Sequence, residues 1–301
     1  MTGQTFTHAP VLLAEVLAQL APRTGGLYVD ATLGRGGHAE AILEASAPDG
    51  RLVGVDRDPR ALEETAPRLA RFGQRVRLVH AAFADLTDVL AGERADGLLA
   101  DLGVSSPQLD DPSRGFSFRA EGPLDMRMDP TRGPSALELI AENDERELAD
   151  LIFRLGEERR SRPIARAIKR LEAAGELHTT GDLRRAVVSV LGPRRSGGID
   201  PATRTFQALR LAVNGELEQL GALLEAAPEV LADGGVAAII SFHSLEDRAV
   251  KRAFRGDARW APTTKKPIVA TDEENAQNPR ARSAKLRAAR RVPREQEGGA
   301  A

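Results

Sequence analysis

The feature that most constrains the fold is an apolar segment that runs directly into a glycine-rich turn. Residues 27–38 read LYVDATLGRGGH, and a second apolar segment at 51–56, RLVGVD, ends in a carboxylate. In mononucleotide-binding α/β folds, glycines let the backbone approach the ligand, and an acidic side chain about twenty positions later accepts from the ribose hydroxyls. The two segments therefore predict parallel strands and a nucleoside-cofactor site, with Asp56 on the ribose. A tight strand-to-helix turn without a ligand is the plainer alternative.

Composition limits the other chemistry that the chain can carry. The 301 residues are enough for a large core or two domains, and 42% are hydrophobic without an apolar run that could span a membrane. Cysteine is absent, which excludes disulfides, thiolate catalysis and cysteine-ligated metals, and the five histidines lack metal-ligand spacing. Residues 1–10 do not have the pattern of a signal peptide. We therefore expect a cytoplasmic protein with no membrane segment and no metal.

The net charge of −2 conceals an uneven distribution. Residues 248–294 hold 14 Lys and Arg against 4 Asp and Glu, whereas the remainder holds 28 basic and 40 acidic residues. A basic block of this size is typical of a surface that contacts nucleic acid. A solvated and partly disordered tail would have the same composition, so charge alone does not decide between the two.

Hydrophobic periodicity predicts alternating helices and strands, which form a parallel sheet with helices on both faces. The expected strands are 27–33, 51–56, 75–80, 97–101, 235–242, 266–270 and 283–291. The expected helices around them are 12–20, 37–46, 58–71 and 201–226. A final hairpin of this kind distinguishes the methyltransferase variant of the fold from the six-stranded dinucleotide-binding one.

The alternation of strands and helices stops after residue 105. Turn-forming residues fill 107–134, and helical sequence without a clear strand continues to about residue 190. We therefore expect a sheet domain in two parts, 1–106 and 201–301, with a small helical domain inserted at 107–200.

Polar clusters follow the ends of the expected strands, where ligands bind in such sheets. These clusters are 34–38, Asp56, 83–85 and 101–108. Backbone amides at Gly36 and Gly37 open a helix, and a helix N-terminus favours a carboxylate or phosphate. Phe83 is placed to lie against an adenine ring, with a purely structural core aromatic as its alternative.

The last of these clusters, ADLGVSSPQLD at 100–110, is the most specific. It places the Asp101 carboxylate and the hydroxyls of Ser105 and Ser106 just past a strand end, beside the expected methyl donor. The amine of cytosine is a poor nucleophile because its lone pair is delocalised into the ring, so acceptors that hold and align it promote transfer. Asp101 can accept from the base's amine or from the cofactor's amino group, or it can cap the following turn. We expect Asp101, Ser105 and Ser106 to be the catalytic residues.

Two further segments carry side chains suited to chemistry or recognition. Residues 241–248, SFHSLEDR, contain Ser, His and Asp, but they are too crowded for a hydrolase triad and lack its nucleophile elbow. We expect 244–247 to cap a helix and His243 to line the cleft or to be structural. Residues 114–119, RGFSFR, interleave aromatic and basic side chains, a pattern that suits stacking on an unstacked base and contact with phosphates.

Three other functions compete with base methylation of RNA. The segment GRGGHA at 34–39 fits the dinucleotide fingerprint of an oxidoreductase, which predicts a six-stranded parallel sheet and leaves the Asp101 cluster without a role. A non-catalytic RNA-binding factor would keep the fold for docking alone. Methylation of DNA or of a small molecule uses the same residue types.

Taken together, the motifs resemble the bacterial 16S ribosomal RNA cytosine-N4 methyltransferases of the RsmH (MraW) type. The resembling segments are 8–15, 30–38, 55–59, 101–108, 115–118, 122–129, 205–210, 241–247 and 278–287. They occur in order over nearly the whole chain, which argues against chance similarity. The chain departs from the family's pattern in two places. Ala120 and Glu121 differ from the family's more usual pairing, and the tail after Arg291 has a Gly, Ala and Glu content that is typical of disorder.

The resemblance implies a class I S-adenosylmethionine-dependent methyltransferase, an α/β fold with a Rossmann-like seven-stranded sheet and an inserted small helical domain. It implies that 1–106 and 201–301 form the methyltransferase domain and that the insertion at 107–200 recognises the substrate. The methyl donor would be S-adenosylmethionine. The substrate would be one cytidine in the decoding region of 16S rRNA in the small ribosomal subunit, unstacked for direct transfer to its amine without a metal or covalent intermediate. The family's cofactor contacts fall on Gly36, Gly37, His38, Asp56, Phe83, Asp101 and Gln108.

Overall fold

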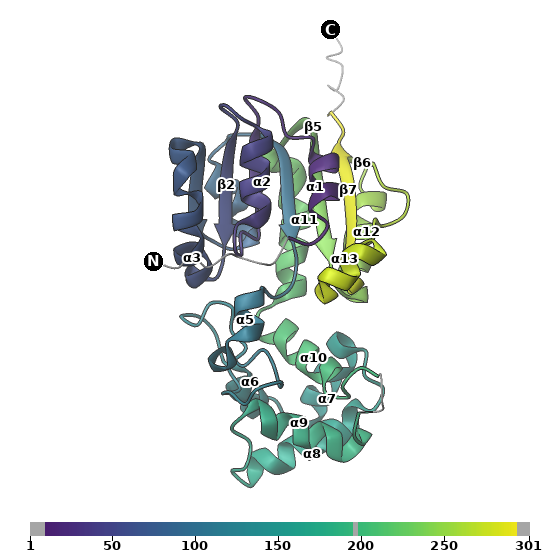
Figure 1. Cartoon of the computed structure of the whole chain (residues 1–301). Coiled ribbons are helices and arrows are strands. Elements are labelled where there is room, and N and C mark those ends of the chain that lie inside the picture. Colours follow the sequence, from purple (N-terminus) through teal and green to yellow (C-terminus); the bar gives the residue numbers. More distant parts are fainter. Residues whose placement is uncertain (1–9, 195–197, 294–301) are drawn as a thin grey trace. The chain divides into compact units, whose positions relative to one another are not determined.

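The chain divides into two compact units, each with its own hydrophobic core (Figure 1). The computed structural model describes residues 10–194 and 198–293. Unit 1 comprises Met1–Gly103 and Leu217–Ala301, and unit 2 comprises Val104–Glu216. Two parts of the sequence discussed above lie outside the described residues: His8, at the start of the resembling segment 8–15, and the end of the tail at 294–301.

Unit 1 is built on a seven-stranded sheet with the order β3-β2-β1-β4-β5-β7-β6. The strands are β1 Leu27–Asp30, β2 Arg51–Asp56, β3 Val76–His80, β4 Ala95–Asp101, β5 Leu231–Ser241, β6 Trp260–Pro262 and β7 Lys285–Arg291. Strands β1 to β5 are parallel, whereas β7 is antiparallel to both β5 and β6. This confirms the seven-stranded α/β fold, and the six-stranded sheet that the oxidoreductase alternative predicted is wrong.

Helices cover both faces of this sheet because successive strand side chains point to opposite faces. Tyr28 packs with buried residues of α1 and α2, and Val29 packs with buried residues of α11 and α12. Figure 1 shows these helices along the sheet. The elements are α1 Leu13–Leu20, α2 Gly37–Ala45, α3 Pro59–Leu69, η1 Ala70–Arg75, η2 Phe83–Asp85, α4 Leu86–Leu90, α11 Glu216–Val230, α12 Ser244–Gly256, α13 Asp272–Gln277 and η4 Pro279–Ser283.

The regular secondary structure of unit 2 is helical over its described residues, apart from one isolated β-bridge between Pro123 and Thr179, and a long loop at 115–135 joins η3 to α6. Its elements are α5 Ser106–Asp110, η3 Pro112–Arg114, α6 Ala136–Glu142, α7 Glu145–Gly156, α8 Ser161–Ala173, α9 Thr180–Leu191 and α10 Thr203–Val213. Capping boxes start α6, α7 and α9, which gives these helices sharp beginnings. Their apolar faces meet in one core.

The expected single helix at 201–226 is wrong, because the structure forms two helices there. Helix α10 ends at Val213 and α11 begins at Glu216, with Gly215 between them at a φ of 55°. Glycine adopts this left-handed conformation without the steric penalty of a Cβ. Helix α10 packs on α7 and belongs to unit 2, so unit 2 extends to Glu216, beyond the expected end of the insertion at residue 200.

The expected strand at 266–270 is also wrong. The edge strand is instead β6, Trp260–Pro262, and Ile268 forms only an isolated bridge with Leu286. Proline has no N–H group, so Pro267 cannot donate to a continuous ladder there.

Candidate functional site

Four acidic side chains are placed at or just beyond the carboxyl ends of neighbouring strands in unit 1. Asp30 ends β1, Asp56 ends β2 and Asp101 ends β4, while Glu246 lies in the first turn of α12, shortly after β5. Because these strands are parallel and adjacent in the sheet, their carboxyl ends share one edge. We call this edge the site edge.

The glycine-rich turn after β1 takes backbone conformations that favour glycine. Gly34 has a φ of 49° and Gly36 a φ of 71°. A Cβ at Gly36 would lie 2.4 Å from Thr65 Cγ2, and one at Gly37 would lie 2.5 Å from Pro10 Cγ. The N-cap of α2 is Gly36, which has no side chain to accept from the first amides of the helix. These amides therefore suit the carboxylate of a cofactor.

Asp56 is held rigidly by the backbone around it. Its Oδ2 accepts from the Gly34 amide at 2.8 Å, and its Oδ1 accepts from the Asp58 amide at 2.8 Å. Burial raises the pKa of Asp56 to about 6, although these two hydrogen bonds act to lower it. Each carboxylate oxygen has a further lone pair, so the fixed group can still accept from ribose hydroxyls.

Asp30 and Asp101 are joined through Thr32. The Asp101 amide donates to Thr32 Oγ1 at 2.6 Å, and the Thr32 amide donates to Asp30 Oδ1 at 3.2 Å. Burial raises the pKa of Asp30 to about 7, opposed by the hydrogen bonds from Thr32. Thr32 therefore ties the end of β4 to the end of β1. Sequence reasoning missed Asp30 and Thr32, although both lie in the resembling segment 30–38.

Asp101 has an unsatisfied carboxylate oxygen. Its Oδ1 is buried and makes no hydrogen bond with any described residue, although 28% of the side chain is exposed. Burial, with added repulsion from Asp30 and Glu246, raises the pKa of Asp101 to about 8. Without a ligand this carboxyl is therefore mostly protonated at neutral pH, and an amino group supplied by a ligand would give the buried oxygen of its ionised form a donor.

His38 lies beside Asp101, with its Nε2 3.8 Å from Asp101 Oδ2. Burial lowers the pKa of His38 to about 4, so the imidazole is uncharged at neutral pH. Neither ring nitrogen makes a hydrogen bond of standard geometry within the described chain, although a weaker interaction with the Val11 backbone partly opposes the lowering of its pKa. The pair is therefore not a charged ion pair at neutral pH, and both side chains retain hydrogen-bonding capacity for a ligand.

Glu246 and His243 organise the start of α12. His243 is the N-cap residue, so the expected cap within 244–247 lies one residue too late. Glu246 Oε2 accepts from the Phe242 amide at 2.8 Å, and Glu246 Oε1 lies 3.1 Å from His243 Nε2. Glu246 is only 2% exposed, so its carboxylate fixes the turn between β5 and α12.

Phe83 begins the short η2 helix after β3 and is partly buried against the core of unit 1. Asp85 Oδ2 accepts from the Ala82 amide at 3.0 Å and so closes this turn. Both the cofactor role and the structural role of Phe83 are compatible with this placement.

Ser105, Ser106 and Gln108 belong to unit 2, where they start α5. Ser105 is the N-cap residue, and its amide donates to Gln108 Oε1 at 2.9 Å. The alternative role of Asp101 as the cap of this turn is therefore wrong. Gln108 is buried and already supports its own helix, a role that sequence reasoning did not assign to it.

The loop 114–119 does not present its aromatic rings for base stacking. Phe116 is 7% exposed in the core of unit 2, and the Phe118 ring packs edge-on against Phe206 with centroids 4.8 Å apart. Arg114 is buried and donates to the carbonyl oxygens of Arg127 and Met128. The expectation of a stacking surface here is therefore wrong, because the apolar rings are used to close the helical core.

The raised pKa of Asp30 predicts a pH-dependent stability that Asp30→Asn removes. The carboxyl loses its proton near pH 3.8 in the unfolded chain and near 7 when folded, so between these values the folded state binds more protons. Stability therefore falls as the pH rises, with a slope from this group of at most about 1.4 kcal/mol per pH unit. Urea unfolding of both proteins between pH 5 and 8, without cofactor, should show the variant gaining relative stability. Parallel pH profiles would contradict the prediction.

The site edge presents polar groups that suit a nucleoside ligand. It combines unsatisfied buried polar atoms at Asp101 and His38 with a glycine turn and a fixed carboxylate at Asp56. Among the described residues, no group of three or more His, Asp or Glu side chains is arranged to hold a metal ion. No helix within 10–194 and 198–293 has the length and hydropathy of a membrane span.

Comparison with known proteins identifies the relatives of this chain. The sequence model of the MraW methylase family matches residues 5–292. A protein of Sorangium cellulosum named "Ribosomal RNA small subunit methyltransferase H" is 64% identical over 288 residues, which cover 95% of this chain and 91% of the relative. A protein of Prochlorococcus marinus with the same name is 55% identical, covering 89% of this chain and 86% of the relative.

A solved structure described as a "putative rRNA-methylase" from Clostridium thermocellum is 14% identical, with a TM-score of 0.44, and covers 93% of this chain and 95% of its own. That similarity is too low to bear on the site. The family match over nearly the whole chain carries the assignment. The chain belongs to the MraW methylase family, and with the sheet order described above it is a class I methyltransferase whose methyl donor is S-adenosylmethionine.

Proposed function

We propose that this protein methylates the exocyclic N4 amine of one cytidine in the decoding region of 16S rRNA. The names of relatives that are up to 64% identical support small-subunit rRNA as the substrate. The observation that supports an amine as the reacting group is the buried Asp101 Oδ1, an acceptor without a donor at the site edge. A cytoplasmic location accompanies this proposal, because bacterial small subunits are made there.

In the proposed mechanism, the cofactor supplies a methyl group on a positively charged sulfonium. Gly36 and Gly37 place backbone amides for its carboxylate, and Asp56 accepts from its ribose hydroxyls. Phe83 and Gln108 complete the proposed cofactor contacts. His38, uncharged at neutral pH, adds no competing positive charge.

Asp101 orients the nucleophile in this proposal. Its ionised carboxylate accepts from the cytidine amine, holding the nitrogen in line with the methyl group. A positive charge nearby lowers the pKa of a carboxyl, so Asp101 would be ionised more readily with a cationic cofactor held at the site edge. Ser105 and Ser106, which follow Asp101 closely in sequence, are retained as further candidates for orienting the amine.

Thr32→Val is expected to lower kcat about tenfold, because the Asp101 amide loses its acceptor at Thr32 Oγ1 and one hydrogen bond contributes about 1.4 kcal/mol. S-adenosylmethionine affinity should change less than kcat, because Thr32 acts through the position of Asp101. Thr32→Ser keeps the hydroxyl and should restore most of the rate. Steady-state kinetics of the three proteins test this, and a Thr32→Ser enzyme as slow as Thr32→Val would contradict it.

The decisive experiment is transfer of tritiated methyl groups from S-adenosylmethionine to 30S subunits purified from a strain that lacks the enzyme. The labelled RNA is digested to nucleosides, and label in N4-methylcytidine is the expected result. Label in another nucleoside would refute the N4 assignment. Cofactor binding without any transfer to RNA would instead favour the non-catalytic RNA-binding alternative.

A further inference from the structure

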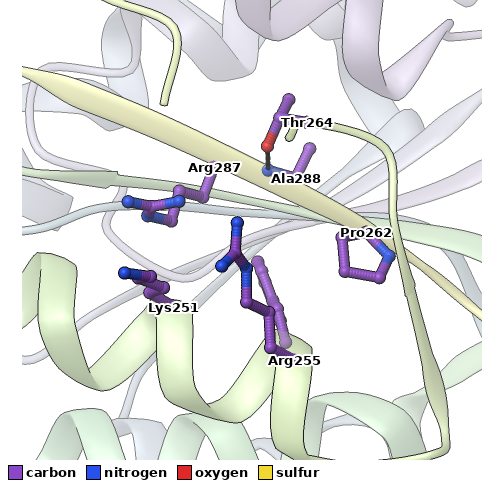
Figure 2. Close-up of a pocket in the computed structure, with 7 residues that line it drawn as sticks. Lys251, Arg255, Pro262, Thr264, Arg287 and Ala288 are labelled. Atoms are coloured by element: carbon purple, nitrogen blue, oxygen red, sulfur yellow. Dashed lines mark hydrogen bonds between the residues drawn. The ribbon is translucent and has the colours of Figure 1, made fainter. Parts of the chain in front are cut away.

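The basic C-terminal block contributes a cationic hollow in unit 1. Figure 2 shows Lys251 and Arg255 from α12 and Arg287 from β7 around this hollow, with Thr264 and Pro262 on its other side. Its empty space, including the part open to solvent, is about 190 Å³. Phe254 and Ala288 complete the lining. None of these lining residues is acidic.

The hollow retains unneutralised positive charge. Arg287 Nε donates to Asp247 Oδ1 at 2.7 Å, and Lys285 Nζ lies 3.6 Å from Asp247 Oδ2. These cations hold the pKa of Asp247 below its usual range, so one carboxylate is shared between two cations. Lys251 makes no hydrogen bond or ion pair with any described residue, and Arg255 donates to the Lys265 carbonyl oxygen at 3.0 Å. Lys251 is therefore available to an external anion.

The cations are arranged in two rows, one along α12 and one along β7, and the β7 row begins at the site edge. Lys251 and Arg255 are four residues apart on one face of α12, which separates them by about 6 Å along the helix. Lys285 and Arg287 are two residues apart on one face of β7, about 7 Å apart. Lys285 pairs with Ser241, the last residue of β5, so this row starts where β5 ends and runs away from the edge.

We propose that this hollow, lined by Lys251, Arg255 and Arg287, binds the phosphodiester backbone of the RNA beside the nucleotide that is methylated. This inference rests on the proposed function, because it takes the substrate to be RNA. An extended polyanion matches cations that lie around the hollow and continue beyond it to Lys285 along β7. Arginine and lysine are the side chains that bind phosphate most strongly, and a solvent-open hollow admits a continuous strand.

The test compares Lys251→Gln and Lys251→Glu with the matched changes Arg94→Gln and Arg94→Glu. Arg94 is an exposed cation immediately before β4, at the opposite end of that strand from Asp101. Binding of a fluorescein-labelled single-stranded RNA with the decoding-region sequence is followed by anisotropy over a series of KCl concentrations. Loss of one phosphate contact in Lys251→Gln should make the slope of log K against log [KCl] shallower by about 0.7. Lys251→Glu should weaken binding about tenfold at low salt.

Neither Arg94 variant should reproduce these effects. If the Arg94 and Lys251 variants lose affinity equally, the effect is one of net charge and the proposed site is wrong. It is equally wrong if both Lys251 variants bind RNA as the unchanged protein does. Calorimetric titration with S-adenosylmethionine, expected to be unaltered, shows that each variant is folded. The proposed function is tested separately: if it is wrong, the unchanged protein will not transfer methyl groups to 30S subunits, whatever the Lys251 variants do.

Discussion

Replacing Asp101 with alanine is expected to lower the rate of methyl transfer to 30S subunits by at least about a hundredfold. The change removes the carboxylate whose Oδ1 is buried without a donor at the end of β4. Loss of one preorganised group that acts on the reacting centre typically costs about 10²–10³ in kcat. Initial rates of tritium transfer, with circular dichroism to confirm the fold, provide the measurement. Turnover comparable to that of the unchanged protein would overturn the assignment of Asp101.

Cofactor affinity distinguishes the two roles left open for Asp101. If Asp101→Ala binds S-adenosylmethionine normally but does not transfer methyl groups, the carboxylate acts on the base's amine. If cofactor affinity falls in proportion to the rate, the carboxylate acts on the cofactor's amino group. Asp88→Ala, which removes an exposed carboxylate from α4, is the control and should retain full activity.

Gly36→Ala is expected to destabilise the protein by about 2–5 kcal/mol and to reduce S-adenosylmethionine affinity more than tenfold. Alanine at a φ of 71° costs about 1–2 kcal/mol, and a Cβ placed 2.4 Å from Thr65 Cγ2 forces a shift that adds about 1–3 kcal/mol. Because Gly36 precedes α2, this shift displaces the amides proposed to hold the cofactor's carboxylate. Chemical unfolding and calorimetric titration measure the two effects.

Gly25→Ala is the matched control for this substitution. Gly25 has a φ of 73°, almost the same as Gly36, but a Cβ there has nothing within 4 Å. It should therefore lose only the backbone contribution of about 1–2 kcal/mol and keep its cofactor affinity. If the two variants behave alike, steric contact with Thr65 is not what makes glycine necessary at position 36.

Much of the sheet could be predicted from the sequence because β1, β2 and β4 are short, mainly apolar runs with a turn after each. The segment 51–56 is a strand as expected, and the strand expected at 27–33 forms over Leu27–Asp30. Asp58 caps α3 by accepting from the Arg60 amide at 3.1 Å. These features depend on neighbouring residues in the chain, which is the scale that periodicity and capping patterns describe.

Features that depend on partners distant in sequence could not be predicted in the same way. The hydrogen bond between Thr32 and Asp101 joins residues 69 positions apart, and it cannot be predicted from the type of either residue. Phe116 and Phe118 stand among basic residues, which suggested an exposed surface, yet the helices of unit 2 supply apolar partners such as Phe206. The missing information in both cases was the tertiary environment, which local sequence does not specify.

Unit 2 is inserted in the sequence between β4 and β5, two strands that pair with each other, and this has a consequence for the order of folding. Strands β4 and β5 are neighbours in the sheet, yet about 130 residues separate Asp101 from Leu231. Closing so long a loop is slow when the chain between its ends is disordered, but a segment that forms its own core shortens the effective loop. We therefore expect unit 2 to fold before β5 joins β4. The central strand pair at the site edge would then be among the last contacts to form, so unfinished chains would lack it.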